Sequence, residues 1–210
     1  MSMRQPEYPI HPLILNRRSP RAMSGESLTD EELLPLFEAA RWAPSSYNAQ
    51  PWRFLYAKRE TKAWSSLFDL LVPFNQSWAN DAAVLVIVAS HTIFESSGKP
   101  SQTHSFDTGA AWENLALEGS SRGLVVHGMQ GFDYKKAKEV CALSDDYAIE
   151  MMIAIGKAGK VKDLPEEVQK KETPSSRKAL SEIVIDLGRD INYTARGSKL
   201  GNFPKSALEV

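Results

Sequence analysis

Continuous apolar runs alternate along the chain with apolar residues at helical spacing. The run Ala83–Ser90, AVLVIVAS, is rich in β-branched residues and predicts a strand that is buried on both faces. Shorter runs of the same kind predict further strands at 52–57, 124–129 and 149–156. Helical spacing predicts helices at 29–43, 60–71, 106–122, 134–142 and 164–171, with a loop at 96–105. Strands that alternate with helices predict a layered α/β or α+β domain.

The helix predicted at 29–43 has a clear start and a disturbed interior. Thr29 and Glu32 have the spacing of a capping box, in which each side chain bonds a backbone amide at the helix start. Pro35 follows at a position where its ring should collide with the preceding turn, so we expect a kink or a later start. Pro44 ends the helix, because the residue before a proline avoids the helical region.

The helix predicted at 106–122 has a narrow polar stripe. At about 100° per residue, one stripe holds the polar residues Asp107, Asn114, Glu118, Ser121 and Arg122. The remaining surface is apolar or small, as at Phe106, Gly109 and Trp112. Such a helix is buried on several sides, which fits either a central core helix or a subunit interface.

Composition restricts the classes of function. The 210 residues favour one domain, and 25 basic against 26 acidic residues give a net charge of -1. This balance argues against a protein built to bind nucleic acid or a membrane surface. The polar start does not look like a signal peptide, and the longest apolar run, 82–89, falls far short of the roughly 20 residues that span a bilayer. We expect a soluble, cytoplasmic protein whose single cysteine, Cys141, is a packing residue.

Several common catalytic motifs are absent from the sequence. There is no GxSxG elbow, no P-loop and no GxGxxG fingerprint. The four histidines are scattered without metal-ligand spacing, so we expect no metal site. His104, Ser105 and Asp107 have the residue types of a hydrolase triad, but such residues within one loop are usually coincidental.

Two polar clusters remain as candidate ligand sites. The segment Arg17–Arg21, RRSPR, concentrates three guanidinium groups and a hydroxyl, which suits a phosphate monoester; the alternative is a solvated surface run. The segment 43–52, APSSYNAQPW, places short hydrogen-bonding side chains between two prolines, which suits the edge of a heteroaromatic ring; the alternative is a plain helix-to-strand loop. Together they fit a ligand with a phosphate at one end and a polar ring at the other, which is the form of FMN.

These motifs resemble those of the nitroreductase family of FMN-dependent oxidoreductases. RRSPR is similar to the opening signature of the family, and APSSYNAQPW is similar to its very specific APSxxNxQPW signature. Asn75 has the spacing of the flavin-edge asparagine, and GMQGFD, 128–133, resembles the segment beside the reactive flavin edge. Residues 107–124 resemble the long dimer-core helix of the family. The segment IAIGKAG, 153–159, is similar to the strand that follows, and SSRKALSEIV, 175–184, is similar to the C-terminal phosphate-contacting segment. The resemblance covers roughly residues 10 to 187.

The resemblance implies an α+β fold: an α/β/α sandwich around a central mixed, mostly antiparallel sheet. It also implies an intertwined homodimer with two FMN sites at the subunit interface, each built from both chains. Residues 1–187 would form the FMN-binding domain. Residues 188–210 would be a C-terminal extension packed on the partner subunit.

The resemblance also assigns roles to residues. The phosphate and ribityl contacts would be Arg17, Arg18, Ser19, Arg21 and Arg177. The contacts to the ring and ribityl chain would be Ser45, Ser46, Asn48 and Gln50, with Asn75 on the pyrimidine side. Gln130 and the Gly131 amide would lie near N5 and O4. The candidates for the substrate pocket are Tyr47, His104 and Phe106. Trp78 and Ser175 stand where the family often has basic residues, which puts in doubt a preference for NADPH.

The implied activity is that of an FMN-dependent oxidoreductase. Hydride would pass from NADH or NADPH through flavin N5 to a small acceptor, such as a nitroaromatic or a quinone, by a ping-pong mechanism. Because the cofactor carries the chemistry, no catalytic side chain is required. Two alternatives remain: a flavin reductase that supplies reduced FMN to a partner enzyme, and a non-catalytic flavin-binding protein.

Overall fold

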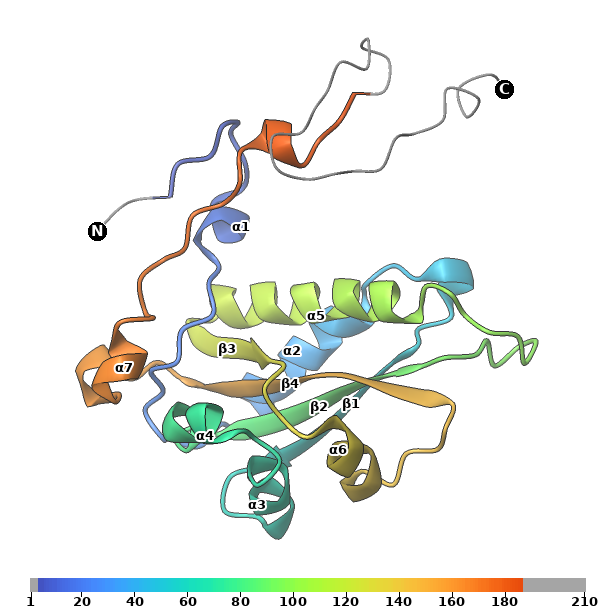
Figure 1. Ribbon diagram of the computed structural model, residues 1–210, viewed down its shortest axis with the longest axis horizontal. Coiled ribbons are helices and arrows are strands. Elements are labelled where there is room, and N and C mark those ends of the chain that lie inside the picture. Colours follow the sequence, from blue (N-terminus) through green and yellow to red (C-terminus); the bar gives the residue numbers. More distant parts are fainter. Residues whose placement is uncertain (1–3, 187–210) are drawn as a thin grey trace. The chain divides into compact units, whose positions relative to one another are not determined.

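The structure is a computed structural model that describes residues 4–186 (Figure 1). The chain divides into two compact units, one formed by residues 10–174 and the other by residues 1–9 with 175–210. The first unit contains every strand and all of the α-helices described below. The predicted C-terminal extension, 188–210, lies outside the described residues.

A four-stranded sheet forms the centre of the larger unit. Its strands are β1 (Trp52–Lys58), β2 (Val84–His91), β3 (Leu124–Met129) and β4 (Tyr147–Lys157), in the spatial order β1-β2-β4-β3. Each neighbouring pair is antiparallel, which agrees with the predicted mostly antiparallel sheet. No parallel pairing occurs within residues 4–186.

Helices cover both faces of this sheet (Figure 1). On one face lie α2 (Asp30–Arg41) and α5 (His104–Ser121). On the other face lie α3 (Lys62–Phe68), α4 (Pro73–Ala79) and α6 (Tyr134–Val140). Two short helices complete the unit, α1 (Pro12–Asn16) and α7 (Glu166–Gln169).

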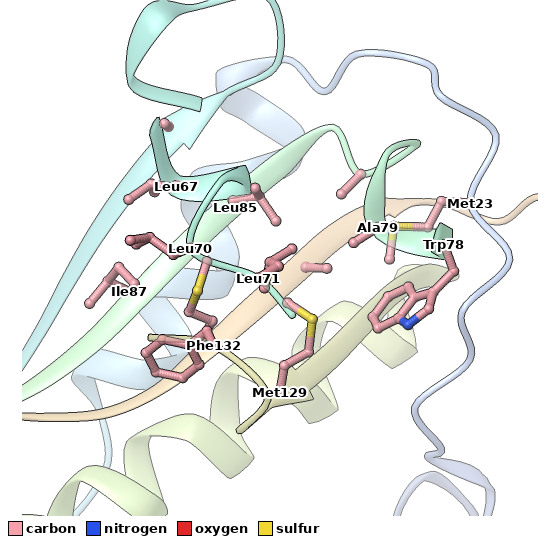
Figure 2. Close-up of a cluster of buried hydrophobic side chains, with 14 of the residues drawn as sticks. Met23, Leu67, Leu70, Leu71, Trp78, Ala79, Leu85, Ile87, Met129 and Phe132 are labelled. Carbon is pink, nitrogen blue, oxygen red and sulfur yellow. The ribbon is translucent and has the colours of Figure 1, made fainter. Parts of the chain in front are cut away.

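Strand β2 contributes to the hydrophobic cores on both faces. Val84, Val86 and Val88 pack in the core under α2 and α5, whereas Leu85 and Ile87 pack in the opposite core. All five are fully buried. Figure 2 shows the second core, in which Leu85 and Ile87 lie with residues of α3, α4 and the segment after β3. The prediction of a strand buried on both faces is therefore confirmed.

The start of α2 confirms the predicted capping box and shows that the later start expected from Pro35 was wrong, while the kink expected as its alternative stays a prediction. The helix begins at Asp30 rather than after Pro35, because the predicted capping box forms. The Thr29 amide donates to Glu32 Oε2 at 2.9 Å, and the Glu32 amide donates to Thr29 Oγ1 at 3.3 Å. Pro35 lies inside the helix and costs it one backbone hydrogen bond.

The region 60–79 also differs from the prediction. A single helix was expected at 60–71, but α3 ends at Phe68 and α4 begins at Pro73. Proline suits the first position of a helix, since its missing N–H would have no partner there. Neither α4 nor α1 was predicted. The predicted helix at 164–171 is only one turn, α7.

Helix α5 begins at His104, so the last residues of the predicted loop are helical. Asp107, which the sequence placed in a polar stripe, is buried, whereas Phe106 is 81% exposed. Ala111, Leu115 and other residues of the buried side pack against α2 and the sheet. An apolar part of α5 therefore remains uncovered. None of the helices in the described part of the chain is long and apolar enough to cross a membrane.

Candidate functional site

Helix α4 positions the predicted flavin-edge asparagine. Asn75 lies in its first turn, and its side-chain Nδ2 donates to the Gly131 carbonyl at 3.0 Å. The Val72 amide donates to the same carbonyl at 3.0 Å. The structure thus brings together two of the predicted site residues from segments 56 positions apart.

Only glycine fits at position 131 without displacing the Asn75 side chain. A Cβ on Gly131 would lie 2.7 Å from Asn75 Nδ2 and 3.0 Å from Val72 Cγ2, closer than side chains normally approach. Beside it, the Gln130 side chain is exposed. Within residues 4–186, neither the Gln130 amide group nor the Gly131 N–H has an intramolecular partner. Hydrogen-bond donors are therefore available next to Asn75.

The predicted phosphate segment follows α1. Arg17 Nε lies 3.3 Å from Glu113 of α5, and its Nη1 lies 3.4 Å from Ser19 Oγ. Arg18 Nη1 donates to the Glu172 carbonyl at 3.2 Å. Three of the predicted phosphate contacts thus lie close together, fixed at one end by α5 and at the other by the segment that follows α7.

Arg21 faces inward from this segment. Its guanidinium Nη1 lies 3.3 Å from Glu172 Oε1 and 3.2 Å from the Lys171 carbonyl. Its backbone amide also donates to Glu172 Oε1, at 3.1 Å. The Glu172 side chain is 6% exposed, and its other oxygen, Oε2, has no hydrogen-bond partner in the described part of the chain. The direct contact of Arg21 with phosphate stays a prediction, since Glu172 holds its guanidinium in this structure.

Helix α4 connects the two groups of residues. The Arg21 guanidinium lies 5.8 Å from the centre of the Trp78 ring, and Lys171 Nζ lies 4.3 Å from the centre of the Phe74 ring. Phe74 and Trp78 are four residues apart, so they share one side of the helix. Asn75, from the same helix, meets Gly131. This short helix therefore joins the basic segment to the Gln130–Gly131 segment.

The predicted ring-binding loop has an unusual backbone. Tyr47, Asn48 and Gln50 have φ values of 52°, 53° and 48°, in the left-handed region that disfavours residues other than glycine. The Gln50 amide donates to Ser45 Oγ at 3.0 Å, which closes the loop. Each non-glycine residue in this conformation destabilises the folded state by on the order of 1 kcal/mol, so it persists only where other contacts hold it. Such strained residues are common at functional sites.

Asp107 supplies one of those contacts. Its Oδ2 accepts from the Ser46 amide at 3.1 Å and from Thr103 Oγ1 at 3.0 Å. Asp107 is buried in the first turn of α5, so it anchors the loop to that helix. Sequence reasoning missed this role. The usable signal was a carboxylate in the first turn of a helix, where backbone amides need acceptors.

The predicted pocket residues differ in exposure. Tyr47 is 94% exposed and meets Phe94 edge-on, with ring centres 5.9 Å apart, and Phe106 is also exposed. His104 Nδ1 lies 2.7 Å from Ser90 Oγ, whose hydroxyl donates to Glu150.

The residues with hydrolase-triad letters do not form a triad. Ser105 Oγ donates to Glu150 at 2.7 Å and lies 3.2 Å from His104 Nδ1. Asp107 bonds Ser46 and Thr103 rather than His104, so the carboxylate of a Ser-His-Asp triad is not in place.

Arg177 belongs to the smaller unit. Its Nη1 donates to Ser175 Oγ and to the Ser176 carbonyl, both at 3.1 Å. Its predicted phosphate contact stays a prediction.

Comparison with known proteins places the chain in a family. The profile of the nitroreductase family matches residues 14–157. A solved structure described as an oxidoreductase containing FMN is 41% identical, with a TM-score of 0.83 over 87% of this chain and 94% of its own. Protein DrgA of Synechocystis sp. strain PCC 6803 is 30% identical over 84% of this chain and 91% of its own. A relative in Archaeoglobus fulgidus, provisionally named NADH dehydrogenase/NAD(P)H nitroreductase, is 33% identical over 53% of this chain and 62% of its own.

The family match and these relatives show that the chain is an enzyme of the oxidoreductase class. The chain belongs to the nitroreductase family.

Proposed function

We propose that this enzyme binds FMN and uses NADH or NADPH to reduce a small electron acceptor. The observation that carries the proposal is the Asn75–Gly131 contact, which lies beside available donors and is joined to the basic segment through α4. When bound, FMN would supply the hydride chemistry of a ping-pong reaction between the nicotinamide and an acceptor such as a nitroaromatic or a quinone.

The charges of the basic segment fit a phosphate monoester. Arg17, Arg18, Arg21 and Lys171 contribute four positive charges, and Glu113 and Glu172 contribute two negative charges, which leaves a surplus of two. A phosphate monoester carries about -1.5 to -2 at pH 7, so this surplus matches one such group. Arginine binds phosphate bidentately and stays charged at any relevant pH, so it would hold the cofactor's phosphate end.

The other end of the site fits the edge of a flavin ring. The Gln130 amide group and the Gly131 N–H can donate to ring nitrogen and carbonyl oxygen, where negative charge is greatest on the reduced ring. Asn75 Nδ2 is committed to the Gly131 carbonyl, which leaves its side-chain oxygen as the acceptor for a ring N–H. These residues would orient the ring and adjust its electronics, and none is required to transfer a proton.

The proposed active unit is a homodimer. Phe106 and Gly109 are exposed on α5, and a Cβ built on Gly109 would meet nothing within 4 Å. Small residues at such positions let a partner helix approach closely. In the dimer, the strained loop that carries Ser45, Asn48 and Gln50 would line the flavin site of the partner subunit.

Anaerobic stopped-flow absorbance tests the activity. The purified protein should be yellow, lose its flavin absorbance when mixed with NADH or NADPH, and regain it with a nitroaromatic or a quinone. Consumption of free FMN as the acceptor would instead indicate a flavin reductase. Colourless protein that neither binds FMN nor oxidises either nicotinamide would contradict the proposal.

A matched pair of variants sharpens this test. Asn75→Ala should weaken FMN retention, because Gly131 loses its side-chain partner. Asn80→Ala, at the exposed C-terminal end of the same helix, should retain FMN as the wild type does. Equal retention by the two variants would remove Asn75 from the site.

Light scattering tests the dimer. The wild type should have twice the mass of one chain. Gly109→Trp should shift it toward the monomer and lower its FMN content, since a large side chain would keep the partner helix away. A monomeric wild type that binds FMN fully would refute the shared site.

A further inference from the structure

His127 is a buried histidine that contacts the phosphate segment. It lies on β3, is 8% exposed, and its Nδ1 lies 2.9 Å from the Pro20 carbonyl. A carbonyl only accepts, so the ring donates through Nδ1–H. Burial lowers the pKa of His127, which keeps the ring neutral near pH 7 and leaves this N–H as its only donor.

Trp78 packs between His127 and Arg21. Its ring centre lies 4.6 Å from that of His127 and 5.8 Å from the Arg21 guanidinium carbon. Trp78 is 1% exposed, and Figure 2 shows it at one end of the core beside Met23. Glu172 bonds the same guanidinium. Pro20 and Arg21 are therefore held by three residues from β3, α4 and the segment after α7.

The chain directly after Arg21 is fixed to the sheet. Met23 bridges Ala158, the Ser24 amide donates to the Lys157 carbonyl at 3.0 Å, and the Gly159 amide donates to the Ala22 carbonyl at 2.9 Å. Pro20 and Arg21 thus connect this fixed stretch to the exposed Arg18 and its neighbours. Their conformation determines the direction in which residues 17–19 leave the sheet.

We propose that His127 and Trp78 are positioning residues for the phosphate end of the ligand site. Through Pro20 and Arg21 they hold residues 17–19 in the conformation that binds a phosphate monoester. This role rests on the proposed function, since it assumes that FMN is the ligand. The proposal also gives Trp78 a role. Trp78 stands where the family often has a basic residue, and its flat ring lies against the Arg21 guanidinium.

Comparing FMN with riboflavin separates positioning from general folding, because the two ligands differ only in the phosphate. His127→Ala leaves the Pro20 carbonyl without its donor and should weaken FMN binding about tenfold, the usual effect of one unmet hydrogen bond. Riboflavin affinity should change less than about twofold, since the ring site is untouched. His127→Asn keeps a side-chain N–H and should recover most of the FMN affinity.

Val125→Ala is the matched control. Val125 lies on the same strand as His127 and packs in the same core as Trp78. Its truncation to alanine therefore tests the effect of a core cavity alone. It should leave the ratio of FMN to riboflavin affinity unchanged. Trp78→Phe keeps an aromatic face under Arg21. It loses no hydrogen bond, since Trp78 Nε1 has no hydrogen-bond partner among residues 4–186. Trp78→Leu should lower the ratio, and Trp78→Phe should not.

Flavin fluorescence titration of the purified proteins gives both affinities. A selective loss of FMN affinity in His127→Ala or Trp78→Leu supports the proposal, and either variant suffices if the other fails to fold. Equal losses for FMN and riboflavin, or no loss for either, overturn it. A wild-type protein that binds neither flavin refutes the proposed function itself, which separates that failure from failure of the positioning role.

Discussion

Gly131→Ala places one methyl group at the closest contact of the proposed site. The new Cβ would lie 2.7 Å from Asn75 Nδ2 and 3.0 Å from Val72 Cγ2, where ordinary contact begins near 3.4 Å. The Asn75 side chain would have to retreat by several tenths of an ångström. That movement stretches its 3.0 Å hydrogen bond to the Gly131 carbonyl. The φ of Gly131 is not positive, so alanine adds no backbone strain of the left-handed kind.

The expected loss of stability follows from these two contacts. Overpacking by one methyl group costs about 1–3 kcal/mol. Removing the conformational freedom of glycine from the unfolded chain returns about 0.4–1 kcal/mol. The net expectation is a loss of roughly 0 to 2.6 kcal/mol in the free energy of unfolding, with a central value of about 1.3 kcal/mol. Asn75→Ala alone should cost about 0.5–1.5 kcal/mol, because the Gly131 carbonyl keeps its second donor, the Val72 amide.

A double-mutant cycle tests the cause. In the Asn75→Ala background the closest atom is absent, so Gly131→Ala should cost about 1 kcal/mol less than it does in the wild type. Urea denaturation of the four proteins measures this coupling without reference to FMN. Additive losses, with no coupling beyond about 0.3 kcal/mol, would refute the reasoning that Asn75 is the group displaced. A Gly131→Ala protein more stable than the wild type would refute the close contact itself.

Three further changes have definite expected outcomes. Burial lowers the pKa of His127 below its ordinary value of about 6.5, so the unfolded chain binds a proton at a higher pH than the folded chain does. The free energy of unfolding should therefore fall as pH decreases below about 6.5. His127→Asn should flatten that part of the pH profile measured by urea denaturation. Asp107→Ala leaves the Ser46 amide without an acceptor and should cost about 1–3 kcal/mol, with faster hydrogen exchange at Ser46. Thr29→Ala breaks the capping box with Glu32 and should cost about 1 kcal/mol in thermal denaturation, whereas unchanged stability would contradict the cap.

The elements that sequence reasoning placed well are those whose pattern is set by the core. Strand β3 was predicted with its actual bounds, 124–129, and β2 within one residue. Both are short and strongly apolar, and β2 is buried on both faces, so the hydrophobic pattern alone identifies them. The capping box at Thr29 was also readable, because it depends on two residues three positions apart.

Helix α4 shows where such reasoning ends. Its seven residues are too few for a helical period to stand out, and it begins at a proline that reads as a break from the preceding apolar stretch. Asn75 was identified only because its spacing resembles that of the family's flavin-edge asparagine. Its partner Gly131 was identified separately, through the segment 128–133, and the contact between them was not predicted. Their contact depends on tertiary packing, which no local pattern encodes.

The face of α5 that is buried could not be predicted either. A helical wheel separates polar from apolar residues, and it placed Asp107 on the polar side. The structure buries Asp107 because the Ser46 amide and the Thr103 hydroxyl, from outside the helix, satisfy its carboxylate. Conversely, Phe106 is exposed in the single chain. The wheel therefore failed where a contact from another element decides burial.

Arg21 best shows how the structure changes the chemical interpretation. From the sequence, the arginines of RRSPR look equivalent, and each is a candidate phosphate contact. In the fold, Glu172 and Trp78 hold Arg21 from two sides, while Arg18 stays exposed. Arg18→Ala should therefore reduce FMN affinity through lost charge, with a clear dependence on salt. Arg21→Ala removes a charge and also disturbs the conformation of Pro20, so part of its effect should depend on salt, and the part that remains at high salt should resemble that of His127→Ala.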